Sequence, residues 1–192
     1  VEKVEMGVVA QGLAKAAQLL ASRYHLVITN VPYLARGKQD GPLKKFADDN
    51  YREAKNDLAT VFLDRCLAFC KEGGTASSVL PQNWLFLTSY RKLREELLKK
   101  QTWNFVAKLG PGAFDTISGE VVKAILASMT RSSHQTEISM AQMIAGLDVS
   151  AARNTGEKAA MLRTAEIKLE YQARQLENPD ARVALGAGND TR

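Results

Sequence analysis

The residues with the clearest chemical potential are Asn30 and Tyr33, which flank a proline in the segment Asn30-Val31-Pro32-Tyr33. An amide can form hydrogen bonds with the edge of a heterocyclic base, and an aromatic ring can stack on the face of that base. Pro32 has no backbone N–H, and it restricts Val31 to extended conformations. The spacing therefore predicts a stiff clamp for a flat heterocycle. The alternative is a strand followed by an ordinary proline turn.

A short strand over 24–29 must position this clamp. Leu26, Val27 and Ile28 are consecutive aliphatic residues, which is typical of a strand buried on both faces in a parallel sheet. In open α/β sheets, ligands bind at the carboxyl ends of the strands. Asn30 and Tyr33 are therefore expected at the ligand-binding edge of a sheet.

The rest of the chain alternates between strand and helix patterns, which favours an α/β fold. The expected elements are helices over 8–22, 51–71 and 87–100, a mobile loop over 37–50, strands over 24–29, 75–80, 103–109 and 120–130, and a possible partner strand over 137–143. Gly73-Gly74 is expected to cap the second helix. The last two strands lie too close together for a crossover helix, so we expect them to form an antiparallel hairpin at the sheet edge.

The composition changes near Gly146, which suggests a division into residues 1–147 and 148–192. The first part is expected to be the catalytic side of one domain. The second is expected to hold a charged surface helix over 156–176 and a linker or frayed tail over 178–192.

Composition limits the class of protein. The 192 residues carry a formal net charge of +5, which permits nucleic-acid binding without requiring it. No apolar run is long enough to span a membrane, and no signal peptide is visible, so we expect a cytoplasmic protein without membrane contact. Cys66 and Cys70 lack the neighbouring ligands of a metal site, and we expect both to be buried and reduced.

The order of several further segments identifies a family resemblance. After the tetrapeptide come Asp57, the run Pro81-Gln82-Asn83-Trp84, a basic helix beginning near Arg91, and Gly110-Pro111-Gly112-Ala113-Phe114. This succession resembles the catalytic half of bacterial N6-adenine DNA methyltransferases of restriction–modification and phage-defence systems. The tetrapeptide resembles their motif IV, with Val31 where these enzymes usually have proline.

The resemblance implies roles for four residues of motif IV. Asn30 and the backbone carbonyl of Val31 would accept hydrogen bonds from the adenine amino group, Pro32 would stiffen the turn, and Tyr33 would stack on the base. Phe114 would stack on the other face, with burial in the core as an equally good alternative.

Two further sets of residues are expected to contact the substrate. Gln82 and Asn83 would line the cleft if their strand neighbours the motif IV strand. Lys38, Lys44 and Lys45 would contact DNA from the loop over 37–50, unless that loop has no function. Arg91, Lys92, Arg94, Lys99 and Lys100 are expected to form a solvated helix face rather than phosphate contacts.

The resemblance also implies S-adenosylmethionine as the cofactor and a Rossmann-like fold. The Gly-rich motif I that normally binds this cofactor has no counterpart before Asn30, where Gly7 and Gly12 lie in or beside a helix pattern. We therefore expect an incomplete cofactor site, unassigned cofactor-binding residues, and a chain that is part of a longer parent acting on double-stranded DNA. The alternatives are a non-catalytic DNA-binding or scaffold module, and a methyltransferase for RNA or protein glutamine.

Overall fold

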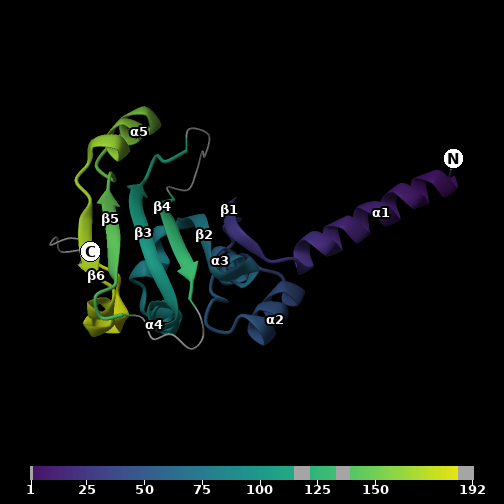
Figure 1. The fold of residues 1–192 in the computed structure, drawn as a ribbon, viewed down its shortest axis with the longest axis horizontal. Coiled ribbons are helices and arrows are strands. Elements are labelled where there is room, and N and C mark those ends of the chain that lie inside the picture. The colour runs from purple at the N-terminus through teal and green to yellow at the C-terminus, as the bar shows by residue number, and fades with distance from the viewer. Residues whose placement is uncertain (1, 115–121, 133–138, 186–192) are drawn as a thin grey trace.

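The computed structural model describes residues 2–114, 122–132 and 139–185, which form a six-stranded mixed sheet with helices packed on it (Figure 1). Its helices are α1 (Glu2–Ala21), α2 (Gly41–Asn50), α3 (Leu58–Phe69), α4 (Arg91–Lys100) and α5 (Thr155–Thr164). Its strands are β1 (Tyr24–Asn30), β2 (Cys70–Pro81), β3 (Gln101–Gly110), β4 (Ala124–Arg131), β5 (Met143–Asp148) and β6 (Lys168–Tyr171). Short 3-10 helices connect them: η1 (Arg36–Lys38), η2 (Gln82–Leu85), η3 (Thr88–Tyr90), η4 (Ala173–Glu177) and η5 (Pro179–Ala181).

The strand order is β1-β2-β4-β3-β5-β6, so the expected partial Rossmann-like α/β fold is confirmed. β1 is parallel to β2, and β3 is parallel to β5, whereas β4 runs antiparallel between β2 and β3. The expected hairpin of 120–130 with 137–143 is wrong, because β4 is an interior strand and β5 begins only at Met143. An antiparallel pair does lie at that edge of the sheet, but it consists of β5 and β6.

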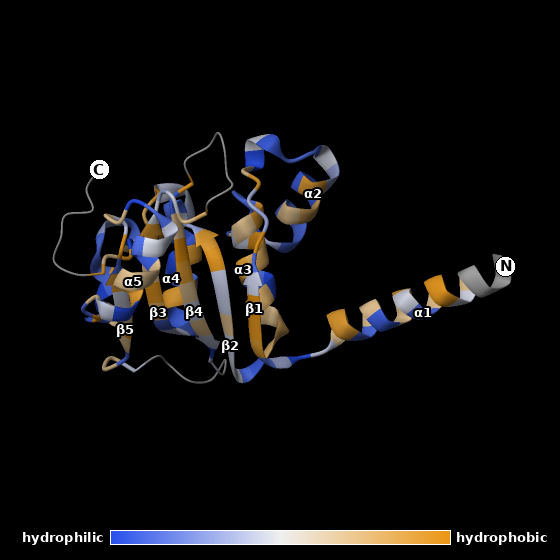
Figure 2. Cartoon of the chain, turned by 90° about the horizontal axis from the view of Figure 1, so that it is seen from above, coloured by the Kyte–Doolittle hydropathy of each residue, from blue (hydrophilic) through white to orange (hydrophobic). Residues whose placement is uncertain are grey.

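One face of the sheet carries the main core. Helices α3 and α4 pack there against apolar side chains of the central strands, among them Leu80, Val106 and Ile125. The opposite face of β2 and β4 is polar in part, since Ser77 donates to Ser128 and the Thr75 and Thr130 hydroxyls share a hydrogen bond. Figure 2 shows the apolar residues concentrated along the strands.

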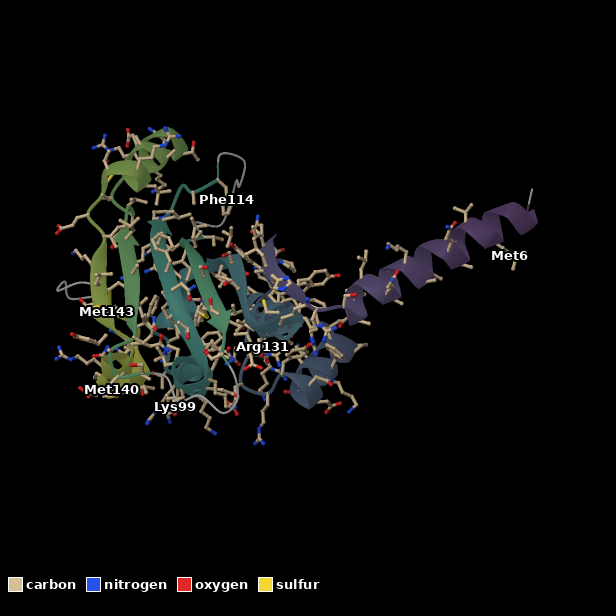
Figure 3. The ribbon with its side chains drawn as sticks, in the orientation of Figure 1. Met6, Lys99, Phe114, Arg131, Met140 and Met143 are labelled. Carbon is tan, nitrogen blue, oxygen red and sulfur yellow. The ribbon has the colours of Figure 1, made fainter. Side chains whose placement is uncertain are left out.

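Strand β1 differs from expectation because it is an edge strand. The side chains of Leu26 and Ile28 are 55% and 72% exposed, so the predicted burial of this strand on both faces is wrong. Helix α1, which precedes it, projects away from the sheet, and apolar residues such as Met6, Val9 and Leu13 are exposed along it (Figures 2 and 3). A run of aliphatic residues identifies a strand, but it cannot show which neighbours cover it.

The connection from α3 to β2 is tighter than expected. The predicted glycine cap at Gly73-Gly74 is wrong, because α3 ends at Phe69 and both glycines lie within β2. The pairing of β1 with β2 shifts register here, and Gly73 has a φ of 73°, a conformation that side chains disfavour. A Cβ at Gly74 would lie 2.8 Å from the Tyr24 carbonyl oxygen, so only glycine permits this close pairing.

The segment over 37–50 is not a mobile loop, and that prediction is wrong. Residues 41–50 form helix α2, which Asp40 caps by accepting a hydrogen bond from the Leu43 N–H at 2.9 Å. Pro42 lies in the first turn, where its missing N–H costs nothing. The glycine and proline that suggested a loop therefore mark a helix start.

The C-terminal region is more ordered than expected. The predicted helix over 156–176 is wrong beyond Thr164, since β6 follows it. Residues 178–185 are not a frayed tail, because Ala181, Val183 and Leu185 are buried in the main core. Residues 186–192 lie outside the described part of the chain. The division at residue 147 stays a prediction.

Among the helices of the described residues, none is long and apolar enough to cross a membrane.

Candidate active site

The carboxyl ends of β1 and β2 define the candidate site. The two strands are parallel neighbours, with Asn30 beside Val79, so Tyr33 and Gln82 leave the sheet at the same edge. The condition set for Gln82 and Asn83, that their strand neighbours the motif IV strand, is therefore met. The pairing of these two parallel strands therefore brings together two motifs that lie about 50 residues apart in the sequence.

A cavity of about 370 Å³ opens at this edge, which is within the usual range of small-ligand sites, roughly 300–1,000 Å³. Its lining residues come from the turn after β1, the start of α3, the η2 region and the approach to β4. They are Tyr33, Ala35, Lys38, Asp57, Pro81, Gln82, Asn83, Phe86, Val122 and Lys123. Of the residues predicted from sequence, the structure thus brings together Tyr33, Gln82, Asn83 and Lys38.

The first three motif IV residues lie beside the cavity rather than in its lining. Asn30 is exposed at the end of β1, Val31 is buried in the core, and Pro32 is exposed. Tyr33 is partly buried and packs against the main core. The turn thus anchors itself through Val31 and extends Tyr33 into the cavity wall, so the roles of Asn30 and Val31 in chemistry stay predictions.

Asp57 fixes the turn that carries Tyr33. Its buried carboxylate accepts hydrogen bonds from the Ala59 N–H at 2.9 Å and the Leu34 N–H at 3.2 Å. The first bond caps α3, and the second holds the residue that follows Tyr33. The Leu58 N–H also donates to the Leu34 carbonyl at 3.0 Å. One carboxylate therefore joins the motif IV turn to the start of a core helix.

The cavity has an unusual polar lining. Burial, together with the Asp57 carboxylate, raises the pKa of Tyr33 to about 12, so its phenol stays neutral at physiological pH. Tyr33 Oη and Asn83 Oδ1 are buried without a hydrogen-bond partner among the described residues. Buried polar atoms are normally paired, so both atoms are exceptions at the cavity wall.

The three predicted lysines do not act as one group. Lys38 lines the cavity, whereas Lys44 and Lys45 lie on α2 and are outside its lining. Lys45 forms an exposed ion pair with Asp49 at 2.9 Å. A DNA contact of Lys44 and Lys45 would therefore be made from a helix surface.

Phe114 is not part of the cavity lining. It is partly buried in a second hydrophobic cluster with Leu109, Ala124 and Val149, at the end of the sheet where β3 stops (Figure 3). This packing favours the burial alternative, and stacking by Phe114 stays a prediction. Residues 115–121, which follow it, lie outside the described chain.

Sequence reasoning missed Phe86 and Lys123 as cavity residues. Phe86 follows the recognised run Pro81-Gln82-Asn83-Trp84, and its aromatic ring two residues beyond Trp84 was the available signal. Lys123 had no local signal, because its position depends on the antiparallel pairing that places Ala124 beside Pro81.

The prediction of a solvated basic face on α4 is only partly right. Arg94 is completely buried, whereas Lys99 projects outward from α4 (Figure 3). Arg91 and Lys100 form exposed ion pairs with Glu95 and Glu96. The other four basic residues are exposed, so the prediction of a solvated face holds for them and is wrong for Arg94.

The expectation of an incomplete cofactor site stays a prediction. Only α1 precedes β1, and both glycines before Asn30 lie within that helix. The described residues also contain no cluster of three His, Cys, Asp or Glu residues able to hold a metal ion. Cofactor-binding residues therefore remain unassigned in this part of the chain.

Comparison with protein-family models matches residues 10–114 to the Eco57I restriction-modification methylase family. The chain belongs to this family. The matched region includes β1, the motif IV turn and the part of the cavity wall that extends from this turn to η2.

Two curated relatives of this chain are named as adenine-specific methyltransferases. BrxX of Escherichia coli O9:H4 (strain HS) is 41% identical over 107 residues, which cover 56% of this chain and 9% of the relative. PglX of Lacticaseibacillus casei (strain Zhang) is 36% identical over 115 residues, which cover 59% of this chain and 9% of PglX. The chain thus spans about a tenth of the length of these relatives.

Solved structures share the fold of this chain. The methyltransferase subunit of a type I restriction-modification system from Streptococcus thermophilus superposes with a TM-score of 0.60 at 16% identity, covering 84% of this chain and 37% of that one. A DrdV–DNA complex superposes with a TM-score of 0.60 at 17% identity, covering 83% of this chain and 18% of that one. Identities this low establish the fold alone.

Proposed function

We propose that this methylase chain is the base-binding part of an S-adenosylmethionine-dependent DNA methyltransferase that modifies the N6 amino group of adenine. The observation that carries the proposal is the cavity at the ends of β1 and β2, where an aromatic ring and two amide side chains meet behind the motif IV turn. The family and the names of BrxX and PglX support adenine as the target.

In the proposed reaction, the adenine leaves the duplex, since its amino group is otherwise paired and enclosed by stacked bases and cannot reach the cavity. Tyr33 stacks on the base, and its neutral phenol avoids placing a negative charge against the ring system. Asn30 and the Val31 carbonyl accept hydrogen bonds from the amino group, which concentrates electron density on the nitrogen that attacks. Gln82 and Asn83 contact the edge of the base.

The methyl donor must be bound largely by the rest of a longer parent chain. The open edge of β1 supports this division, because Leu26, Ile28 and the apolar side chains of α1 have no covering partner among the described residues. Lys38 and Lys123 border the cavity and are placed to attract the phosphates next to the flipped nucleotide. Such an enzyme of a restriction–modification or defence system would act in the cytoplasm, on double-stranded DNA.

The test is methyl transfer by the full-length parent with labelled S-adenosylmethionine. Duplex DNA, RNA and a glutamine-containing protein substrate are compared, and labelled nucleosides are then identified. N6-methyladenine from DNA alone is the expected product. Label in RNA or protein would move the function to the corresponding acceptor class. DNA binding without transfer to any acceptor would identify a non-catalytic module.

A further inference from the structure

Phe86 stands where the cavity wall meets the core. It follows η2 directly, it lines the same cavity as Tyr33, and its side chain is partly buried against the main hydrophobic core. The two rings reach the cavity from different strands, Tyr33 from the end of β1 and Phe86 from the end of β2. The cavity therefore has two aromatic side chains in its lining.

The backbone around Phe86 is held on both sides. Its own N–H donates to the Asn83 carbonyl at 3.2 Å, and the Leu87 N–H donates to the same oxygen at 3.0 Å. The buried guanidinium of Arg94 donates to the Trp84 carbonyl at 2.6 Å and the Leu87 carbonyl at 2.7 Å. Phe86 lies between these two carbonyls, so its position is set before any ligand arrives.

The C-terminal segment strengthens this arrangement. The Val183 N–H donates to the Leu85 carbonyl at 3.0 Å, and Arg94 also donates to the carbonyls of Asp180 and Ala181, at 2.8 and 3.1 Å. Asp180 and Ala181 have φ values of 56° and 51°, which non-glycine residues rarely adopt. Such a conformation persists only where surrounding contacts require it, and here those contacts brace the segment that carries Phe86.

Phe114 has a different environment. Its ring packs in the cluster of Leu109, Ala124 and Val149 and is absent from the lining of the Tyr33 cavity. Phe86, in contrast, borders the cavity. The same pocket also contains the unpartnered Asn83 Oδ1, three residues before Phe86.

We infer that Phe86 is a base-binding residue, and that it forms with Tyr33 the aromatic enclosure for the flat heterocycle. The inference rests on the proposed function, because it assigns a second ring to the same site. The ligand it selects is a planar base with a polar edge, since the rings contact the faces and the amides of Gln82 and Asn83 contact the edge.

The experiment compares substitutions at Phe86 in the full-length parent, with kcat/KM for methylation of DNA as the readout. Phe86→Leu retains apolar volume against the core and removes the ring, so it should lower kcat/KM about tenfold or more, as expected from the loss of one base–aromatic contact. Phe86→Tyr and Phe86→Trp retain a ring and should keep activity within about threefold of the parent. Phe62→Leu, on α3 and outside the cavity lining, is the matched control and should have the smaller effect.

The melting temperature of each variant separates folding from binding. A Phe86→Leu variant with parental melting temperature and parental kcat/KM would overturn the inference, as would an equal loss of kcat/KM in Phe62→Leu. If Phe86→Leu melts early, kcat/KM is measured at a temperature at which this variant is folded. A value still about tenfold below the parent then supports the inference, and a parental value overturns it. A parent that methylates no adenine at all contradicts the proposed function instead, which keeps the two failures distinct.

Discussion

Asn30 and Tyr33 occupy different environments, and this decides how each can be tested. Asn30 is exposed at the end of β1, so truncating its side chain should cost little stability, at most about 1 kcal/mol. If its amide orients the adenine amino group, Asn30→Ala should lower methylation by the full-length parent by orders of magnitude while DNA affinity hardly changes, because the contact matters most in the transition state. Thr29→Ala, on the other face of β1, is the control. A near-parental rate in Asn30→Ala would remove the methyltransferase assignment from this turn.

Tyr33 should make the stability of the fold depend on pH. Burial and Asp57 raise its pKa to about 12, and the same causes raise that of Tyr90 to about 12. A tyrosine in the unfolded chain loses its proton near pH 10, so between about pH 10 and 12 the unfolded state binds fewer protons and the free energy of unfolding falls as pH rises. Tyr33→Phe should make this fall shallower in urea titrations at about pH 9 and 11. An equal slope in both proteins would show that Tyr33 is not shielded from solvent.

At the residue scale, the sequence predicted those contacts that follow from strand order. Tyr33, Gln82 and Asn83 come together because two parallel strands end side by side, which the alternating pattern implies. Phe86 and Lys123 depend on turn geometry and antiparallel register, which single-residue patterns do not encode. Arg94 looks like any surface arginine, since its burial depends on carbonyls that lie up to 87 residues away.

At the scale of elements, the existence and type of most segments were predictable, and their ends were not. Helix α3 begins at Leu58 rather than Tyr51, because the Asp57 carboxylate caps its first turn and residues 52–56 form turns. The region over 41–50 was misassigned because a helix-starting glycine and proline resemble a loop when the capping role of Asp40 is overlooked. The capping residues Asp40 and Asp57 therefore mark the helix starts better than the composition of these segments does.

Asp57 and Asp40 cap α3 and α2 in different settings, so removing each cap should cost a different amount of stability. Asp57→Ala removes the cap of α3 and the bond to the Leu34 N–H in a buried setting, so it should lower the free energy of unfolding by about 2 kcal/mol. Asp40→Ala removes only the exposed cap of α2 and should cost about 1 kcal/mol or less. Urea denaturation of both variants and of Asp57→Asn measures the difference. Equal losses at Asp57 and Asp40 would mean that the bond to the motif IV turn contributes nothing.

At the scale of the whole molecule, the two ends of the described chain differ in how they pack. Residues 172–185 pack beside α4, where the buried Gln172 donates to the Leu98 and Gln101 carbonyls. At the other end, Leu26 and Ile28 of β1 are exposed and α1 projects away from the sheet. The sequence could not predict this asymmetry, because an aliphatic strand has the same pattern whether or not its neighbour is present.

The open edge leads to a prediction about the cofactor. The isolated 192-residue chain should bind S-adenosylmethionine weakly or not at all, whereas the full-length parent should bind it, because no Gly-rich turn lies ahead of Asn30 in this chain. Ile28→Lys tests the same surface, since a charge is tolerated on a side chain that is 72% exposed but is costly against a covering apolar element. It should leave the melting temperature of the isolated chain unchanged and lower both melting temperature and cofactor affinity in the parent. Micromolar binding by the isolated chain in calorimetry, or equal effects of Ile28→Lys in both proteins, would show that this edge is not where the rest of the enzyme joins.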